Sequence, residues 1–271
     1  MKKSELQDAA SKDGKHPLLQ SAEAIKLASE AAVRYIAALP DRRVSPGQEA
    51  VNALDMLGGD LPEAGTTKET LQLLALQGSA ATTATAGGRF FGLVTGGSLP
   101  AAAGARVMNA AWDQIAFSDA TSATAVHCET VAAQWMLDLL GLPRTCSVGF
   151  VTGATMSSFT CFAGARHALL ARMGWNVEEN GLFGAPDLRV VTSDQSHVTI
   201  AKALSLLGIG TARIETVPTD ANGAMIADQM PKLDGRTIVV TQAGNVNTGA
   251  CDRWFQRVDA THALKRSAGV S

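Results

Sequence analysis

Hydrophobic positions in the N-terminal part of the chain recur at helical spacing. Between residues 21 and 39 they fall on one face of a helix, and Pro40 ends the pattern. Residues 41–67 are rich in Gly, Pro and Asp and show little periodicity, which is typical of a connecting arm. A second helical pattern covers residues 123–140 and stops at Gly141. The sequence therefore predicts two amphipathic helices separated by less regular chain.

Further along, the pattern changes to short apolar strands that alternate with helical stretches. The predicted strands are residues 147–152, 188–193, 212–217 and 237–241. The predicted helices are residues 157–173, 197–207 and 224–230. This alternation implies crossover connections and a mostly parallel sheet with helices on both faces, so the fold class is α/β. We expect an N-terminal helical arm, residues 1–82, followed by an α/β domain, residues 83–271.

Composition and charge narrow the class of partner. The 271 residues are 46% hydrophobic and carry a formal net charge of -2, so no long-range field favours nucleic acid or an anionic membrane. The four cysteines form no Cys-x-x-Cys pair, which argues against a zinc site or a disulfide framework. A small-molecule partner is therefore the better hypothesis, with no metal.

Targeting signals are the next feature of the sequence. Met1, Lys2 and Lys3 precede polar residues rather than an apolar run, unlike a secretory signal peptide. Apolar runs all fall short of the roughly twenty residues that a membrane-spanning helix needs. We therefore expect a cytoplasmic protein.

Candidate functional residues follow the predicted strands. This position is informative because ligands of parallel sheets bind beyond the carboxyl ends of the strands. At the first strand end a turn of small residues leads into a helix, where free N–H groups and the Thr155 hydroxyl suit a phosphate, although any tight turn can look the same. His197 follows the second strand, either facing a cleft or bonded to its own loop. The Gly- and Asn-rich turn at residues 242–252 could equally be a simple turn.

Five segments resemble, in their order and their sequence motifs, the group II pyridoxal-phosphate decarboxylases, which act on glutamate, tyrosine, dopa and related amino acids. These segments are residues 88–100, 128–131, 135–143, 192–197 and 244–252. The run from Thr192 to His197 is the most specific of them. The resemblance implies a fold-type I large domain, a homodimer and the cofactor pyridoxal 5'-phosphate.

The resemblance also implies roles for individual residues. Ala154 and Thr155 match the turn that holds the cofactor phosphate, and His197 matches the catalytic histidine that stacks on the pyridine ring. Asn247 and Thr248, with Asn245 beside them, match side chains that line the cofactor pocket. The implied reaction is decarboxylation of an amino acid by a carboxy-lyase, in which the cofactor accepts electrons as carbon dioxide leaves.

The sequence departs from the family after Asp252. In the family, an Asp that pairs with the pyridine nitrogen and a Lys that holds the cofactor covalently both lie beyond this position. Here Lys265 is the only later lysine, and it falls at the end of a helical stretch rather than after a strand. We therefore expect a chain that is truncated, lacks the small C-terminal domain and is impaired in catalysis. The alternatives are a noncatalytic fragment and another fold-type I lyase or transaminase.

Overall fold

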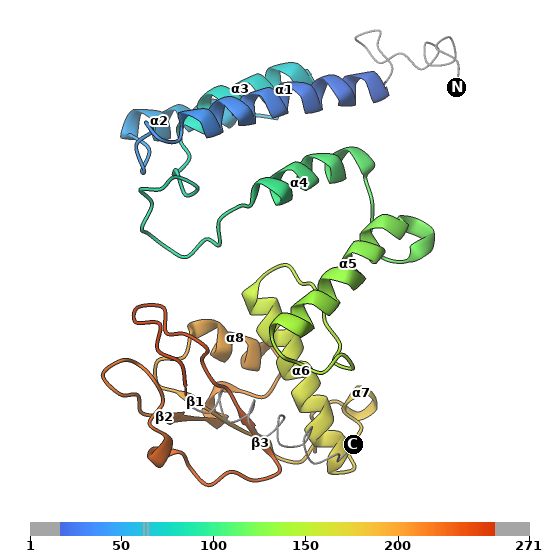
Figure 1. The fold of residues 1–271 in the computed structure, drawn as a ribbon, viewed down its shortest axis with the longest axis vertical. Coiled ribbons are helices and arrows are strands. Elements are labelled where there is room, and N and C mark those ends of the chain that lie inside the picture. The colour runs from blue at the N-terminus through green and yellow to red at the C-terminus, as the bar shows by residue number, and fades with distance from the viewer. Residues whose placement is uncertain (1–16, 62, 64, 253–271) are drawn as a thin grey trace. The chain divides into compact units, whose positions relative to one another are not determined.

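The structure is a computed structural model that describes residues 17–61, 63 and 65–252. Contacts within the chain divide it into two compact units that meet at Val126 and His127, inside helix α5 (Asp119–Leu139). Figure 1 labels the helices and strands of both units. Lys265 and the other residues after Asp252 lie outside the described part of the chain.

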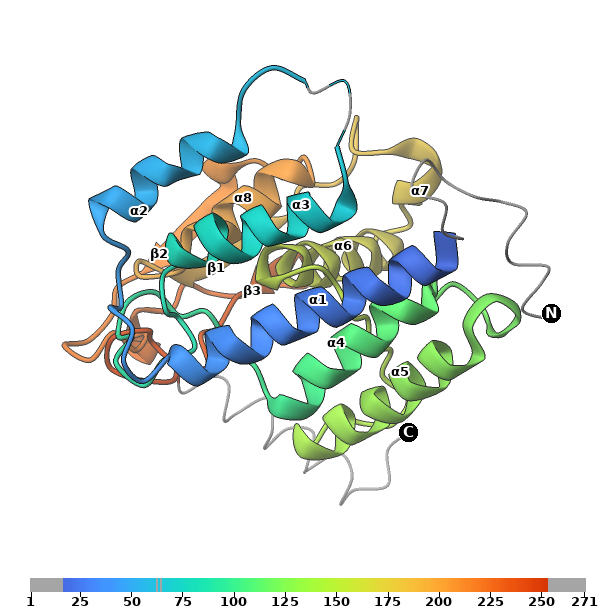
Figure 2. The same ribbon diagram turned by 90° about the horizontal axis from the view of Figure 1, so that it is seen from above.

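The first unit is helical. Its elements are α1 (Pro17–Ala38), α2 (Gln48–Asn52), a 3-10 helix (Ala53–Leu57), α3 (Thr67–Leu73), a π-helical turn (Leu74–Gly78) and α4 (Pro100–Trp112). Helix α1 confirms the first predicted helix, and it lies beside α3 (Figure 2). Helix α3 is capped by Thr66, whose hydroxyl oxygen accepts from the Glu69 N–H and whose hydroxyl donates to the Glu69 carboxylate.

Helices α2, α3 and α4 of this unit were not predicted. The arm at residues 41–67 contains α2, whose five residues are too few to leave a periodic pattern. Helix α4 begins with Pro100 as its first residue and continues through three alanines, a strong local helix signal that hydrophobic spacing alone does not show. Helix α5 starts earlier than predicted and is kinked at Ser122, which has φ −162° and ψ 68°.

The Arg42 side chain connects the arm, residues 41–67, to the segment near residue 80. Its guanidinium donates to the Ser79 carbonyl at 2.7 Å and lies 4.7 Å from the centre of the Tyr35 ring. Ala84 is buried and donates its N–H to the Val44 carbonyl. The arm therefore contacts residues that come before and after position 82 in the sequence. The domain boundary expected at that position stays a prediction.

The second unit holds the predicted parallel sheet. Its described elements after α5 are α6 (Ala154–Arg172), α7 (Val177–Asn180), β1 (Arg189–Ser193), α8 (Val198–Leu206), a 3-10 turn (Thr211–Arg213), β2 (Ile214–Val217), a 3-10 turn (Ala227–Gln229) and β3 (Thr237–Val239). The strand order is β2-β1-β3, and both pairs are parallel. Val190 of β1 is in register with Ile214 and Ile238, which confirms the α/β class.

The two faces of this sheet are covered differently. Val190 and Ile238 pack with Phe162 of α6 and with Leu204 of α8, so both helices lie on one face (Figure 1). Val191 points to the opposite face, where it packs with buried Val217 and Met225. Among the described residues, the second face is therefore covered by irregular chain between β2 and β3.

The prediction of a strand at residues 147–152 was wrong. These residues form no strand, and Val148, Phe150 and Val151 are 36%, 53% and 41% exposed. An apolar run becomes a strand only when a neighbouring strand satisfies its backbone, and β2-β1-β3 is the sheet that the described residues form.

The helix predicted at residues 224–230 was also wrong. Only a 3-10 turn forms there, and Met225 instead pairs in antiparallel fashion with Thr219 across a turn. Pro231 restricts the residue before it, and Met230 is accordingly extended with ψ 127°. The segment therefore stays irregular although its composition is compatible with a helix.

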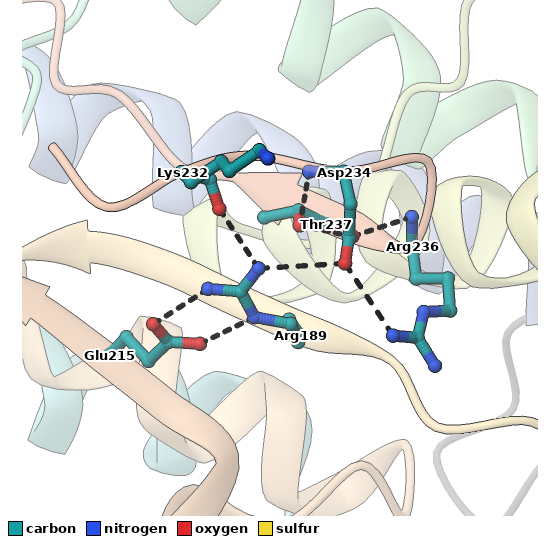
Figure 3. A network of polar contacts seen from close by, with 6 residues as sticks. All are labelled: Arg189, Glu215, Lys232, Asp234, Arg236 and Thr237. Atoms are coloured by element: carbon teal, nitrogen blue, oxygen red, sulfur yellow. Dashed lines mark hydrogen bonds and ion pairs between the residues drawn. The ribbon is translucent and has the colours of Figure 1, made fainter.

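An ion-pair network joins the amino ends of the three strands (Figure 3). The Arg189 guanidinium donates to both carboxylate oxygens of Glu215, at 2.7 and 2.9 Å, and to the Lys232 carbonyl at 3.0 Å. Asp234 lies 3.6 Å from both Arg189 and Arg236. The hydrogen bond from Arg189 lowers the pKa of Glu215, and hydrogen bonds from the Thr237 hydroxyl and the Arg236 N–H lower the pKa of Asp234.

These lowered pKa values predict a loss of stability in acid. Their contribution is fully present above the ordinary carboxyl pKa values of 4.5 and 3.8, and it disappears as pH falls through the lower folded-state values. We expect the urea midpoints of the wild type and of Arg189→Met to differ most at neutral pH. The difference should narrow as pH falls below these ordinary carboxyl values, leaving only the loss of the pH-independent bond to the Lys232 carbonyl. The exposed Arg213–Asp187 pair is the control, and a difference that does not narrow in acid would contradict the assignment.

Candidate functional site at the carboxyl ends of the strands

The carboxyl ends of the three strands lie at one edge of the sheet, because all are parallel. β1 ends at Ser193, β2 at Val217 and β3 at Val239. The Asp194 N–H donates to the Val217 carbonyl, and the Val240 N–H donates to the Val191 carbonyl, so the loops leave the sheet in contact with it. This edge is the position at which open parallel sheets bind ligands.

His197 leaves this edge as the residue that caps helix α8. Its Nδ1 lies 2.8 Å from the Thr199 hydroxyl and accepts from the Thr199 N–H at 3.3 Å. The neutral imidazole therefore carries its proton on Nε2. The side chain is exposed, so its ring is oriented by the helix start while Nε2 and the ring faces stay accessible. The interpretation of His197 as a helix-start residue bonded to its own loop is therefore confirmed, and its role toward a ligand stays a prediction.

Helix α6 begins at Ala154, after Gly153. No side chain caps this helix start, and no acidic residue lies in its first turn. Ala154 is exposed and Thr155 is half-buried. The first N–H groups of a nineteen-residue helix and the Thr155 hydroxyl are therefore available to an anion, although the strand predicted before them does not form.

The turn after β3 is organised around Asn245. This side chain is 7% exposed, and its Oδ1 accepts from the Asn247 N–H at 2.9 Å and from the Thr248 N–H at 3.4 Å. Asn247 and Thr248 are themselves exposed. The Thr248 hydroxyl donates to the Asn222 carbonyl at 2.5 Å, so it fastens the turn to the neighbouring segment.

The buried carboxylate of Asp252 stabilises the end of this turn. It is 1% exposed, and its two carboxylate oxygens accept from the Met225 and Gln242 N–H groups, each at 2.7 Å. Both oxygens are therefore engaged by the backbone. Asp252 is a structural acceptor here and not a free carboxylate that could pair with a pyridine nitrogen.

Three residues of this edge were not singled out by the sequence reading. Gln195 accepts from the Asn245 amide at 2.9 Å, and Gly223, with φ +81°, lies against both side chains. The buried role of Asp252 was also missed. The Asn222-Gly223 pair is a turn signal that could have located the contact, whereas nothing in the sequence joins Gln195 to a residue fifty positions away.

The site residues therefore form two groups. The His197 loop and the turn with Asn247 and Thr248 are joined through Gln195 and Asn245. Ala154 and Thr155 start a helix that packs against α8, but no hydrogen bond joins them to His197 in the described part of the chain.

The donor set fits a phosphorylated aromatic cofactor. An uncapped, acid-free helix start and a hydroxyl suit a phosphate, and an accessible imidazole ring suits stacking on a heteroaromatic ring. Within residues 17–61, 63 and 65–252, no three His, Cys, Asp or Glu side chains gather as metal ligands do. No helix in those ranges is both long and apolar enough to cross a membrane. The class that this fold and edge define is an α/β protein with candidate donors for a phosphate-bearing ligand beside the carboxyl ends of its strands.

Comparison with known proteins agrees with this class. The family model described as the pyridoxal-dependent decarboxylase conserved domain matches residues 80–259, which is more than half of the chain. The chain belongs to this family of pyridoxal-dependent decarboxylases. The matched range contains all the candidates for binding the phosphate, stacking on the ring and lining the pocket, which are Ala154, Thr155, His197, Asn247 and Thr248.

Individual relatives match over shorter stretches. The glutamate decarboxylase of Drosophila melanogaster is 31% identical over 106 residues, which cover 39% of this chain and 20% of that protein. The aromatic-L-amino-acid decarboxylase of Bacillus atrophaeus is 29% identical over 145 residues, which cover 51% of this chain and 28% of that protein. The chain thus matches less than a third of the length of these relatives.

Solved structures support the fold. The crystal structure of mouse CSAD in apo form superposes with a TM-score of 0.75 at 20% sequence identity, covering 89% of this chain and 53% of that one. This likeness confirms the predicted fold-type I architecture.

Proposed function

We propose that this chain binds pyridoxal 5'-phosphate at the carboxyl edge of its sheet, within a protein that decarboxylates an amino acid. The observation that carries the proposal is the family match across residues 80–259, which spans every donor at that edge. The cofactor, when bound, supplies the electron sink that lets a carboxylate leave as carbon dioxide.

The chain's own residues divide the work of binding. The N–H groups of the first turn of α6 and the Thr155 hydroxyl hold the phosphate, with Ala154 keeping the approach open. His197 offers its ring face to the cofactor, held in orientation by Thr199. Asn247 and Thr248 line the pocket from the turn after β3.

An acidic residue at the start of α6 is expected to abolish most of the phosphate affinity. Ala154→Asp places a carboxylate beside the anion site, and the repulsion between close charges predicts at least about a tenfold loss. The probe is 4'-deoxypyridoxine 5'-phosphate, which lacks the aldehyde and binds without a covalent bond to lysine. Ala171→Asp adds the same charge to the last turn of the same helix and is expected to leave binding unchanged. Equal losses in both variants would contradict the placement of the phosphate.

The activity itself is tested by carbon dioxide release. The purified chain with pyridoxal phosphate would be given glutamate, tryptophan or dopa, because the relatives are named for both acidic and aromatic substrates. Release above that of free cofactor supports the proposal. If the cofactor binds but no carbon dioxide forms, the noncatalytic alternative holds for this chain. Amino-group transfer to a keto acid would favour a transaminase.

Assembly and location complete the proposal. We propose a homodimer, as the resemblance implies, and a cytoplasmic location, which four free and exposed cysteines support because reducing compartments keep thiols unpaired. We also keep the division into an arm, residues 1–82, and a cofactor-binding domain from residue 83. Sedimentation of the purified chain at several concentrations tests the dimer.

A further inference from the structure

Two loops at the carboxyl edge are joined by a single side-chain contact. The Asn245 Nδ2 donates to the Gln195 Oε1 at 2.9 Å, across fifty positions of sequence. Gln195 lies two residues before His197, and Asn245 lies two residues before Asn247. The contact therefore connects the loop that carries the ring-stacking candidate to the turn that carries the pocket-lining candidates.

The Asn245 side chain is held in one orientation. It is 7% exposed, and its Oδ1 is occupied by the N–H groups of Asn247 and Thr248, so its amide nitrogen must face Gln195. Its backbone is also fixed, since its N–H donates to the Ala250 carbonyl and its carbonyl accepts from Gly249, both at 2.8 Å. A buried amide with these bonds has little freedom to move.

Gly223 closes the contact from a third segment. A Cβ at this position would lie 2.8 Å from the Gln195 Oε1 and would also collide with the Asn245 amide. The Thr248 hydroxyl holds the preceding residue, Asn222, by its carbonyl at 2.5 Å. The segment between β2 and β3 therefore packs its backbone directly on the amide pair, which leaves no room for a side chain at position 223.

We infer that Gln195, Asn245 and Gly223 form a positioning device that keeps the His197 loop in register with the Asn247–Thr248 turn. The inference rests on the proposed function for its purpose, which is to present both loops to the cofactor. None of the three residues needs to touch the cofactor. They act through His197, Asn247 and Thr248.

Hydrogen-bond chemistry supplies a sharp test. Gln195→Glu keeps an acceptor facing the Asn245 amide, so the bond survives. Asn245→Asp keeps the acceptor for Asn247 and Thr248, and the Gln195 amide can rotate to donate to the new carboxylate. The double variant places two carboxylates against each other with no proton between them. Each single change should therefore be mild, and the combination should open the contact.

The first readout is backbone hydrogen exchange without any ligand. In the double variant we expect the Thr199, Asn247 and Thr248 amides to exchange at least about tenfold faster than the product of the two single effects predicts. Gln48 and Asn52 of α2 make the same kind of amide contact, at 2.9 Å on an exposed helix face, and the double variant Gln48→Glu with Asn52→Asp is the matched control. Exchange that rises only additively, or equally in the control, overturns the inference.

The second readout separates the inference from the proposed function. Affinity for 4'-deoxypyridoxine 5'-phosphate should fall about tenfold beyond additivity in the same double variant and stay unchanged in the control. If the wild type binds and the double variant loses affinity only additively, the positioning role is overturned. If the wild type does not bind the probe, the proposed cofactor fails, and the exchange result still decides whether the amide pair couples the loops.

Discussion

Replacing Asp252 with alanine is expected to destabilise the second unit by about 2 to 5 kcal/mol. The change leaves the N–H groups of buried Met225 and half-buried Gln242 without acceptors, and an unsatisfied buried donor costs about 1 to 3 kcal/mol. Met225 is 3% exposed, so water cannot easily replace the lost bond. Urea unfolding of the purified variant, with the slope compared to the wild type, measures the loss.

A matched control lies in the neighbouring turn. Asp220 also accepts from two backbone N–H groups, those of Asn222 and Ala224, at 2.8 and 3.1 Å. Its side chain is exposed, so water can satisfy the same donors when it is removed. Asp220→Ala should therefore cost much less than Asp252→Ala. Similar losses in the two variants would show that burial of Asp252 does not set its contribution.

The second large effect is expected at Leu204. This α8 side chain is 0% exposed and packs among Phe162, Val190 and Ile238, where α8 and α6 meet the sheet. Leu204→Ala removes buried methyl groups and leaves a cavity, which predicts a loss of about 2 to 5 kcal/mol. Thermal or urea unfolding measures it. Because α8 also carries His197 at its start, loosening this helix should weaken binding of the cofactor analogue as well.

Leu206, on the same helix, provides the comparison. It is 62% exposed, and Leu206→Ala should change stability by less than about 0.5 kcal/mol. The two substitutions delete the same atoms two residues apart. A loss at Leu206 as large as at Leu204 would mean that α8 does not rest on the sheet by the face described here.

Local patterning predicted the elements that have strong, short-range signals. Helix α1 ends near Pro40, and the alternation of β1, α8 and β2 could be predicted because the buried strand β1 is followed by a helical stretch and then by a second apolar run. The apolar run at 147–152 carried the same signal and failed, because a strand needs a partner that the run itself does not encode. Pro231 and the Asn222-Gly223 turn outweighed the helical composition of residues 224–230.

The residues of the candidate site also divide into those that the sequence predicted and those that it could not predict. The sequence indicated Ala154, Thr155 and His197 through turns, helix starts and motifs similar to those of the family. The structure places all three at or beside helix N-termini. The amide pair of Gln195 and Asn245 could not be predicted, because it is created only when β1 and β3 become neighbours in the sheet. Long-range side-chain contacts of this kind depend on topology and leave no local pattern.

The most direct test of the central claim is a titration of the chain with 4'-deoxypyridoxine 5'-phosphate, followed by the phosphorus resonance of the probe. We expect saturable binding at one site per chain, with a shifted resonance that Ala154→Asp removes and Ala171→Asp keeps. Absence of saturable binding, or binding that both variants leave unchanged, would contradict a cofactor site at the carboxyl edge of this sheet.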